Sequence, residues 1–226
     1  MARLRKAAKI WRRPQSRTAA GCAEVEAADG FFAVNPTAIF GSAGPPLEIE
    51  LGAGTGDFII ARAGECPDRN FLAIESSRVV ARMLAVRCGR AALRNLRVIR
   101  MDARTLVNLM IGSRSVSAYH VYFPDPWPKE RHHKRRLFTP YLVANLERTL
   151  TPGGTLYVAT DVGDYAGEIF AMLDATALVR SPEEVPGSAK TAFGRKFAAG
   201  GKAIHARAYR KSPALETRPF EKGAGS

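Results

Sequence analysis

Five short runs of β-forming residues alternate with helical stretches, and this alternation limits the fold more than any other feature of the chain. The runs cover residues 47–51, 70–74, 96–100, 118–122 and 155–159. Strands separated by helices pair in parallel and need helices on both faces of the sheet. The sequence therefore predicts an α/β fold with a doubly wound, mostly parallel sheet.

One helix between two of these runs is marked at both ends. Thr139 can cap the helix and Pro140 suits its first position. Apolar residues repeat along one face, at Leu142, Val143, Leu146 and Leu150. The Pro-Gly-Gly sequence at 152–154 then ends the helix and leads into the fifth run. We therefore predict a helix from Thr139 to Thr149.

The rest of the chain suggests one domain with two flanking segments. We expect residues 1–30 to form a basic, flexible arm, 31–211 to form the α/β domain and 212–226 to be a disordered tail. Within the domain, residues 164–174 fit a helix and 203–209 alternate well enough for a late strand.

Basic residues outnumber acidic ones by 34 to 21, giving a net charge of +13. The excess lies in three blocks. Residues 1–18 and 190–211 each hold seven Lys or Arg and no acid, and 129–136 hold five against one acid. Neutralising phosphates releases counterions, so the blocks predict a nucleic-acid partner. Solubilising surface charge is the alternative.

The N-terminus, the cysteines and the apolar runs indicate the cellular compartment. The Arg-rich start suits either an organelle transit peptide or an arm that contacts RNA. No apolar run approaches the ~20 residues of a membrane helix, so we expect no membrane partner. The three cysteines, Cys22, Cys66 and Cys88, are not spaced as zinc or redox ligands. These features predict a cytoplasmic protein without a metal site.

Each predicted strand ends in an acid or is followed by one. The five acids are Glu50, Glu75, Asp102, Asp125 and Asp161. Ligands of open α/β sheets bind beyond the carboxyl ends of the strands, so we expect these carboxylates around one site.

A glycine-rich loop follows Glu50, with glycines at Gly52, Gly54 and Gly56. Glycine lets a backbone turn tightly and approach a ligand closely. A dinucleotide fingerprint would place its last glycine at position 57, which is Asp57, so a nicotinamide-dependent oxidoreductase is disfavoured. The shorter spacing predicts an S-adenosylmethionine loop.

Two of the acids then suit the remaining parts of S-adenosylmethionine. Glu75 can accept hydrogen bonds from both ribose hydroxyls, and Asp102 can accept one from the adenine amino group. Helix capping is the alternative for each, because acids favour helix N-termini.

The segment Phe123–Lys129, Phe-Pro-Asp-Pro-Trp-Pro-Lys, follows the fourth strand. Its prolines leave the backbone few conformations, which suits a loop that holds catalytic groups in place. Asp125 can accept hydrogen bonds from guanine N1–H and the exocyclic amino group, leaving N7 free. Trp127 can stack on a base. The alternative is a structural turn before a solvated basic segment.

The stretch at 123–137 closely resembles the signature of the tRNA (guanine-N7)-methyltransferase family. Similarity runs from about residue 30 to about 211 and includes 50–56, 71–75, 95–98, Asp102, 152–154 and 159–161. The resemblance implies a seven-stranded, Rossmann-like methyltransferase sheet. It also implies that the chain methylates N7 of a guanosine in the variable loop of tRNA. We expect the protein to be a monomer or weak homodimer.

The resemblance also assigns roles to single residues. Glu50, Glu75 and Asp102 would bind S-adenosylmethionine. Asp125 would lie at the active site and face the cofactor, and Lys129 and Asp161 would contact the substrate.

The family's late substrate motif matches Thr191, Ala192, Phe193 and Gly194, with glycine where the family has glutamate. That substitution puts one substrate contact in doubt. Residues 217–221 keep a glutamate but contain an extra residue.

Two other functions remain open. A purine amino-group methyltransferase would carry a second proline before the aromatic residue, which Asp125-Pro126-Trp127 lacks. A non-catalytic tRNA-binding relative is supported only by Gly194.

Overall fold

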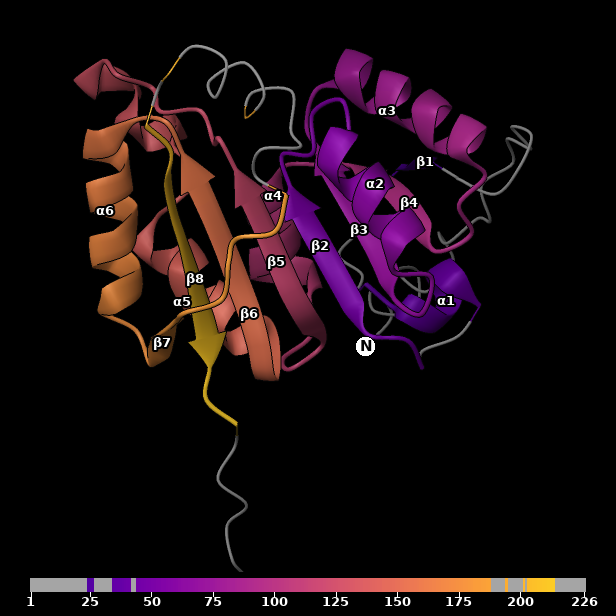
Figure 1. Ribbon diagram of the computed structural model, residues 1–226. Coiled ribbons are helices and arrows are strands. Elements are labelled where there is room, and N and C mark those ends of the chain that lie inside the picture. The colour runs from indigo at the N-terminus through magenta and orange to yellow at the C-terminus, as the bar shows by residue number, and fades with distance from the viewer. Residues whose placement is uncertain are drawn as a thin grey trace, which may run out of the picture.

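The computed structural model describes most of the predicted domain (Figure 1). The described residues are 24–26, 34–41, 44–187, 194, 201 and 203–213. Nearly all of the predicted N-terminal arm and tail lies outside them.

A central eight-stranded sheet has the order β1-β4-β3-β2-β5-β6-β8-β7. Its strands are β1 (Glu24–Glu26), β2 (Leu47–Leu51), β3 (Asn70–Glu75), β4 (Leu96–Arg100), β5 (Val116–Tyr122), β6 (Leu150–Thr160), β7 (Leu178–Ser181) and β8 (His205–Lys211). Strands β1 to β6 pair in parallel, whereas β8 runs antiparallel to both β6 and β7. The strand order reverses between β2 and β5, which creates a crevice at their carboxyl ends.

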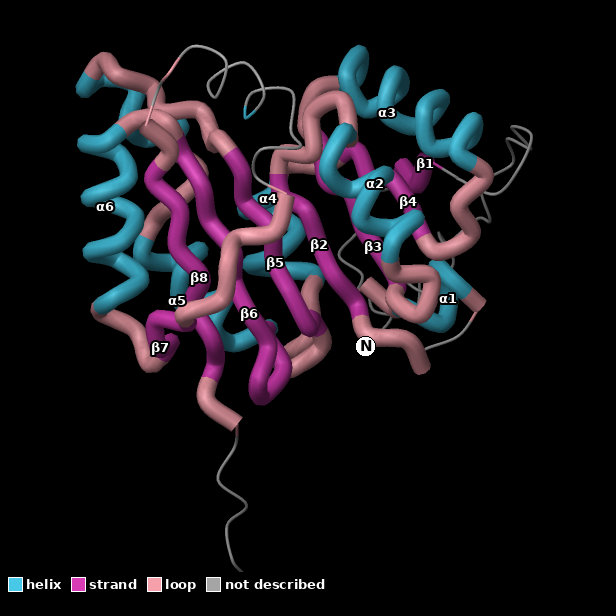
Figure 2. Tube along the Cα trace, in the orientation of Figure 1, coloured by secondary structure: helices cyan, strands magenta, loops and turns pink. Residues whose placement is uncertain are grey.

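Helices connect the strands and flank the sheet (Figure 2). They are α1 (Pro36–Phe40), α2 (Asp57–Glu65), α3 (Arg78–Ala91), α4 (Ala103–Thr105), the π-helix η2 (Leu106–Met110), the 3₁₀-helix η3 (Glu130–Arg135), α5 (Pro140–Thr149) and α6 (Gly163–Asp174).

Strand β3 shows why both faces are covered. Its side chains alternate between two buried clusters, because successive residues of a strand point to opposite faces. Phe71 and Ala73 pack in the cluster that contains α2 and α3. Leu72 and Ile74 pack in the cluster that contains η2, α5 and α6. A strand buried on both faces is apolar along its interior, as residues 71–74 of this one are.

The predicted fold class is confirmed, with helices on both faces of a mostly parallel sheet. The sheet has one strand more than the seven expected, because β1 adds a three-residue edge beside β4. Those residues fall in the range assigned to the arm, and here they belong to the sheet.

The local predictions also have outcomes. Helix α5 starts as predicted, with the Thr139 hydroxyl accepting a hydrogen bond from Leu142 N at 3.2 Å. The late strand runs from His205 to Lys211, two residues later than expected at each end. Strand β7 was missed.

Candidate active site

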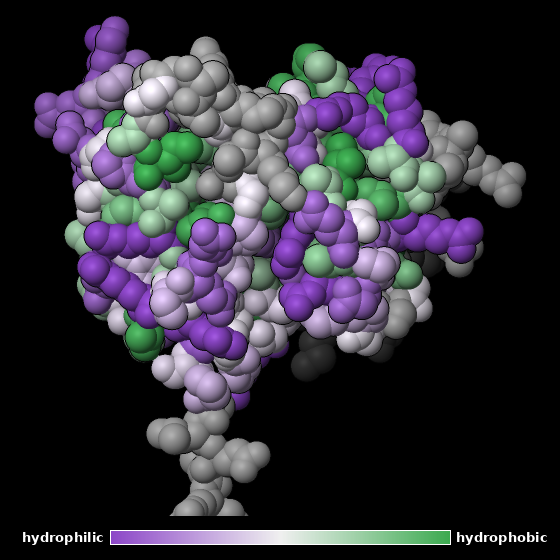
Figure 3. Space-filling model, viewed as in Figure 1, coloured by the Kyte–Doolittle hydropathy of each residue, from purple (hydrophilic) through white to green (hydrophobic). Residues whose placement is uncertain are grey.

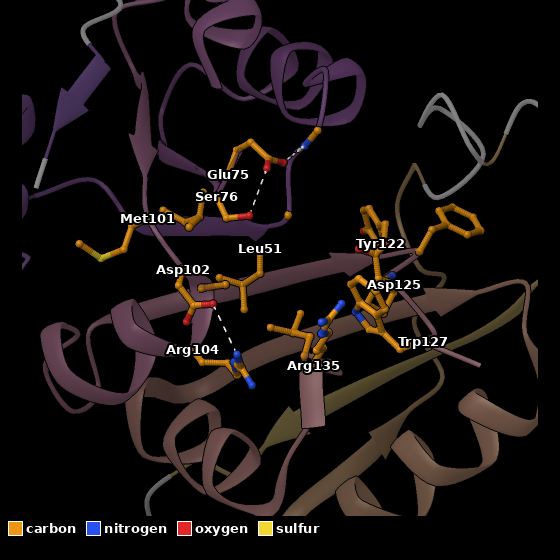
Figure 4. Close-up of a pocket in the computed structure, with 17 residues that line it drawn as sticks. Leu51, Glu75, Ser76, Met101, Asp102, Arg104, Tyr122, Asp125, Trp127 and Arg135 are labelled. Atoms are coloured by element: carbon orange, nitrogen blue, oxygen red, sulfur yellow. Dashed lines mark hydrogen bonds and ion pairs between the residues drawn. The ribbon is translucent and has the colours of Figure 1, made fainter. Parts of the chain in front are cut away.

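A pocket of about 260 Å³ lies at the point where the strand order reverses. Its walls come from the carboxyl ends of β2, β3, β4 and β5 and from the loops after them. It is lined by Leu51, Gly52, Gly54, Ile74, Glu75, Ser76, Met101, Asp102, Ala103, Arg104, Tyr122, Phe123, Pro124, Asp125, Trp127, Arg135 and Leu137. Figure 4 shows Glu75 and Ser76 across this pocket from Arg104 and Arg135.

The glycine loop presents bare backbone to the pocket. Gly52 and Gly54 have φ of 78° and 54°, and a Cβ built on either would meet no atom within 4 Å. Gly56 has φ of 79° but lies under α3, where a Cβ would come 2.0 Å from Leu84 Cδ1. The first two glycines therefore leave room for a ligand, and the third allows close packing.

Glu75 holds this loop and also the start of α3. Its Oε2 accepts a hydrogen bond from Gly54 N at 3.1 Å, and its Oε1 accepts one from Ser77 N at 2.7 Å. Ser77 is the cap of α3. The Ser76 hydroxyl also donates to Oε1, at 3.5 Å. The carboxylate therefore lines the pocket with a lone pair on Oε2 left for a ligand.

Asp102 both caps a helix and lines the pocket. Its Oδ1 accepts hydrogen bonds from Thr105 N and the Thr105 hydroxyl at 2.9 and 3.2 Å. Its Oδ2 lies 3.8 Å from the Arg104 guanidinium. Capping is therefore one function of this side chain, and Oδ2 remains accessible for another.

Glu50 lies beneath the pocket rather than in its wall. The side chain is buried, and its Oε2 has no hydrogen-bond partner among the described residues. Burial raises the pKa of Glu50 well above its usual range, and the charges of Asp57 and Glu75 raise it further. This carboxyl therefore favours its neutral form, and a cation bound nearby would favour the ionised form.

The loop after β5 has an unusual backbone. Phe123 and Trp127 have φ of 51° and 42°, in a region that aromatic residues rarely adopt. Phe123 N donates a hydrogen bond to Ala159 O at 2.7 Å, which fixes the loop to β6. Asp125 lies exposed at the pocket between these two positions. Strain of this kind persists only where its surroundings enforce it, and it often marks a functional site.

The indole of Trp127 is held by the basic segment that follows it. The Arg135 guanidinium lies 4.9 Å from the ring centroid, and the His132 ring meets it edge-on at 5.8 Å. Arg135, predicted as a phosphate contact, therefore lines the pocket and stacks on Trp127.

Some of the predicted site residues line the pocket and others do not. It includes Gly52, Gly54, Glu75, Asp102 and Asp125. Residues that do not line it are Glu50, Gly56, Lys129, Asp161 and Gly194. Thr191, Ala192 and Phe193 lie outside the described residues.

Sequence reasoning missed Tyr122, Met101 and Arg104 as lining residues. Their positions next to the strand-end acids were the only available signal.

A buried polar chain runs from Tyr122 along the face of the sheet that packs against α2. The Tyr122 hydroxyl donates to Pro186 O at 2.7 Å and lies 2.9 Å from His120 Nδ1. His120 Nε2 lies 2.9 Å from Glu48 Oε2. Arg69 approaches the other Glu48 oxygen at 2.7 Å. His120 is thus hydrogen-bonded at both ring nitrogens.

Two kinds of feature are absent from the part of the chain that the structure describes. It contains no helix long and apolar enough to cross a bilayer. It also contains no group of His, Cys, Asp or Glu side chains arranged to hold a metal ion.

The sheet, the glycine loop and the carboxylates at the switch point define a Rossmann-like, S-adenosylmethionine-dependent methyltransferase. A family model described as "Putative methyltransferase" matches residues 45–206. The chain belongs to the tRNA (guanine-N(7)-)-methyltransferase family.

Relatives of that name support this membership. The chain is 36% identical to the one from Syntrophotalea carbinolica over 182 residues, which cover 78% of each chain. It is 37% identical to the one from Geobacter metallireducens, covering 77% of this chain and 86% of the relative. With the one from Bordetella pertussis it shares 42% identity, over 64% of this chain and 56% of the relative.

Solved structures support the fold. The aminoglycoside resistance methyltransferase NpmB1 matches with a TM-score of 0.52 at 15% identity, over 75% of this chain and 89% of the other. A SAM-dependent methyltransferase from Aquifex aeolicus matches with a TM-score of 0.52 at 12% identity, over 78% and 89%.

Proposed function

We propose that this protein transfers a methyl group from S-adenosylmethionine to N7 of a guanosine in tRNA. The observation that carries the proposal is the pocket itself. A glycine loop with open backbone forms one wall, and the strained loop with Asp125 and Trp127 forms another. One wall suits the methyl donor and the other suits a purine.

The pocket's own groups fit S-adenosylmethionine. Glu75 Oε2 keeps a lone pair for a ribose hydroxyl, and Asp102 Oδ2 can accept a hydrogen bond from the adenine amino group. Leu51, Ile74 and Met101 supply apolar contacts for the adenine ring. The unpaired Oε2 of Glu50 favours a cation nearby, and S-adenosylmethionine carries two cationic groups.

The chain's residues then orient the base. When bound, S-adenosylmethionine supplies an electrophilic methyl group. Guanine N7 carries a free lone pair, so no residue has to remove a proton. Asp125 accepts hydrogen bonds from N1–H and the exocyclic amino group, which orients the purine. Its negative charge favours the positive charge that develops on the purine in the transition state. Trp127 stacks on the base.

The choice of tRNA rests on charge and family membership. Segment η3 has three exposed cations, Arg131, Lys134 and Arg135, and two half-buried histidines, and Lys129 precedes it. Lys129, Asp161 and the segment 191–194 are our candidates for contacts with the guanosine. By family resemblance the target lies in the variable loop, and we place the reaction in the cytoplasm.

Methyl transfer from labelled S-adenosylmethionine to unmodified tRNA tests the proposal. Digestion to nucleosides should give 7-methylguanosine. Methyl groups on an exocyclic amino group would instead identify the amino-group methyltransferase. Binding of tRNA without any transfer would identify the non-catalytic relative.

A further inference from the structure

Helix α3 carries an arginine-rich face that the proposed site does not use. Residues 76–101 contain seven arginines and no acid. This stretch begins at Ser76 in the pocket wall, so α3 starts at the edge of the site. Figure 3 shows hydrophilic and hydrophobic residues side by side over α3, at the upper right of the view.

Three of the arginines form one ridge of α3. Arg78, Arg82 and Arg90 are exposed, and none forms an ion pair with another described residue. Residues four apart are neighbours on a helix, so Arg78 adjoins Arg82, and Val86 lies between Arg82 and Arg90 in the same row. The ridge extends about 18 Å from Arg78 to Arg90. Arg87 differs, because it pairs with Asp57 at 2.6 Å and binds Thr55 O.

The helix dipole favours only Arg90, which lies in the last turn of α3. The dipole disfavours the cation of Arg78 in the first turn, and Arg82 follows Arg78 one turn later. Their spacing of four residues also brings like charges together, which is unfavourable. An anionic partner would remove both penalties.

Apolar side chains lie beside the arginines. Val79, Met83 and Val86 are 70%, 52% and 50% exposed. The chain's own N-terminal residues 1–18 are an unsuitable cover, because they hold seven basic residues and no acid. A second copy of α3 would be repelled in the same way. The charge therefore favours a polyanion with apolar surfaces between its charges, as RNA has.

We infer that the α3 face formed by Arg78, Arg82 and Arg90 is a second tRNA-binding surface, across the pocket from η3. This inference rests on the proposed function. RNA that enters the pocket is held through its phosphates on both sides, by α3 on one and by η3 on the other. The phosphate spacing of a nucleic acid is short enough for several contacts along this ridge.

Substitutions at Arg82 test the inference. Arg82→Gln removes one positive charge without adding a negative one. It should weaken binding of unmodified tRNA severalfold at low salt and reduce the salt slope of log Kd by about one. Arg82→Gln/Arg90→Gln should reduce the slope by about two. The affinity for S-adenosylmethionine and the thermal midpoint should stay unchanged.

Arg114→Gln is the matched control. Arg114 is equally exposed, but it precedes β5 at the opposite end of the sheet, so tRNA binding should be unaffected. If Arg82→Gln retains the wild-type slope while the wild-type protein methylates tRNA, the α3 surface is refuted and the proposed function stands. If the wild-type protein neither binds nor methylates tRNA, both fail. Polyglutamate serves as a probe for an acidic protein partner. If Arg82→Gln loses polyglutamate binding but keeps the wild-type affinity for tRNA, the α3 face binds an acidic protein instead.

Discussion

Arg136 donates a hydrogen bond from Nε to the backbone oxygen of Pro126 at 2.8 Å, which ties the basic segment to the loop that carries Asp125. Arg136 is only 9% exposed. It forms an ion pair with Glu168, and its guanidinium lies 4.8 Å from the Tyr165 ring centroid. A buried arginine with three partners can enforce the strained backbone at Trp127.

Replacing this arginine should therefore impair catalysis more than cofactor binding. Arg136→Lys keeps the charge but cannot reproduce the planar fork that reaches Pro126 and Glu168 together. We expect kcat for tRNA methylation to fall by about 10- to 100-fold, because the loop positions the base. Arg131→Lys, in the same basic run but exposed, should leave kcat unchanged. If Arg136→Lys also keeps the wild-type kcat, charge alone is sufficient at this position. If the two variants lose kcat equally, the effect does not depend on the buried contacts of Arg136.

Asp125 should be needed for transfer and not for RNA binding. Asp125→Asn removes the charge that favours the cationic purine, so kcat should fall by about 100-fold or more. The Kd for tRNA should change little, because phosphate contacts supply most of that affinity. Steady-state kinetics and tRNA titration measure the two quantities separately. A variant that loses tRNA binding together with activity would show that Asp125 is structural.

Two glycines of the cofactor loop should respond differently to the same change. Gly54→Ala and Gly56→Ala both impose a positive φ on alanine, which costs about 1 kcal/mol. The added Cβ meets open space at Gly54 and Leu84 at Gly56. We expect Gly54→Ala to stay folded and bind S-adenosylmethionine more weakly.

Gly56→Ala should instead destabilise the fold by about 3 kcal/mol, since Leu84 is fully buried. Urea unfolding and calorimetric titration of the cofactor distinguish the two effects. A Gly56→Ala variant as stable as Gly54→Ala would contradict the close packing of α3 on this loop.

Much of this arrangement was predictable from short-range patterns. The strands, the cap at Thr139 and the carboxylates at strand ends depend on residues near one another in sequence. The position of Glu50 was not predictable in this way. Its strand is buried on both faces, so its carboxyl lies beneath the pocket.

Contacts between residues far apart in the sequence were also not predictable. Arg136 is one cation in a run of similar cations, and only its distance from Glu168 in the fold singles it out. Glu48 resembles any polar residue of a half-exposed strand. Its partners Arg62, Arg69 and His120 are brought to it by α2, the loop after α2 and β5. Their separation of 14 to 72 residues leaves no local signal.

The Glu48 cluster should make the protein sensitive to acid. Burial alone would raise the pKa of Glu48, but His120 and Arg62 together lower it from 4.5 to about 2. Burial lowers the pKa of His120 from 6.5, although Glu48 partly opposes this, and Arg62 and Arg69 lower it further. The Tyr122 hydroxyl, which is hydrogen-bonded to His120, and the Tyr157 ring, which stacks on His120, complete the surroundings of this histidine.

Both pKa shifts make the folded protein less stable as the pH falls. A depressed carboxyl pKa contributes stability that is fully present above pH 4.5 and is lost as the pH falls toward 2. A depressed histidine pKa means that the unfolded chain takes up a proton first, so stability also falls as the pH drops below 6.5. The stability that this cluster contributes therefore falls in two successive pH ranges, first below 6.5 and then below 4.5.

Glu48→Gln should test this directly. The substitution leaves two arginines without their buried partner and should cost about 3 kcal/mol at pH 7. It should also flatten the fall in stability below pH 4.5, because the titrating carboxyl is gone. Urea unfolding at pH 7, 5 and 3 measures both effects. Glu184→Gln, at an exposed carboxyl, should do neither. If Glu48→Gln keeps the wild-type pH dependence below pH 4.5, the acid sensitivity has another origin, because this variant has no carboxyl at position 48 to titrate.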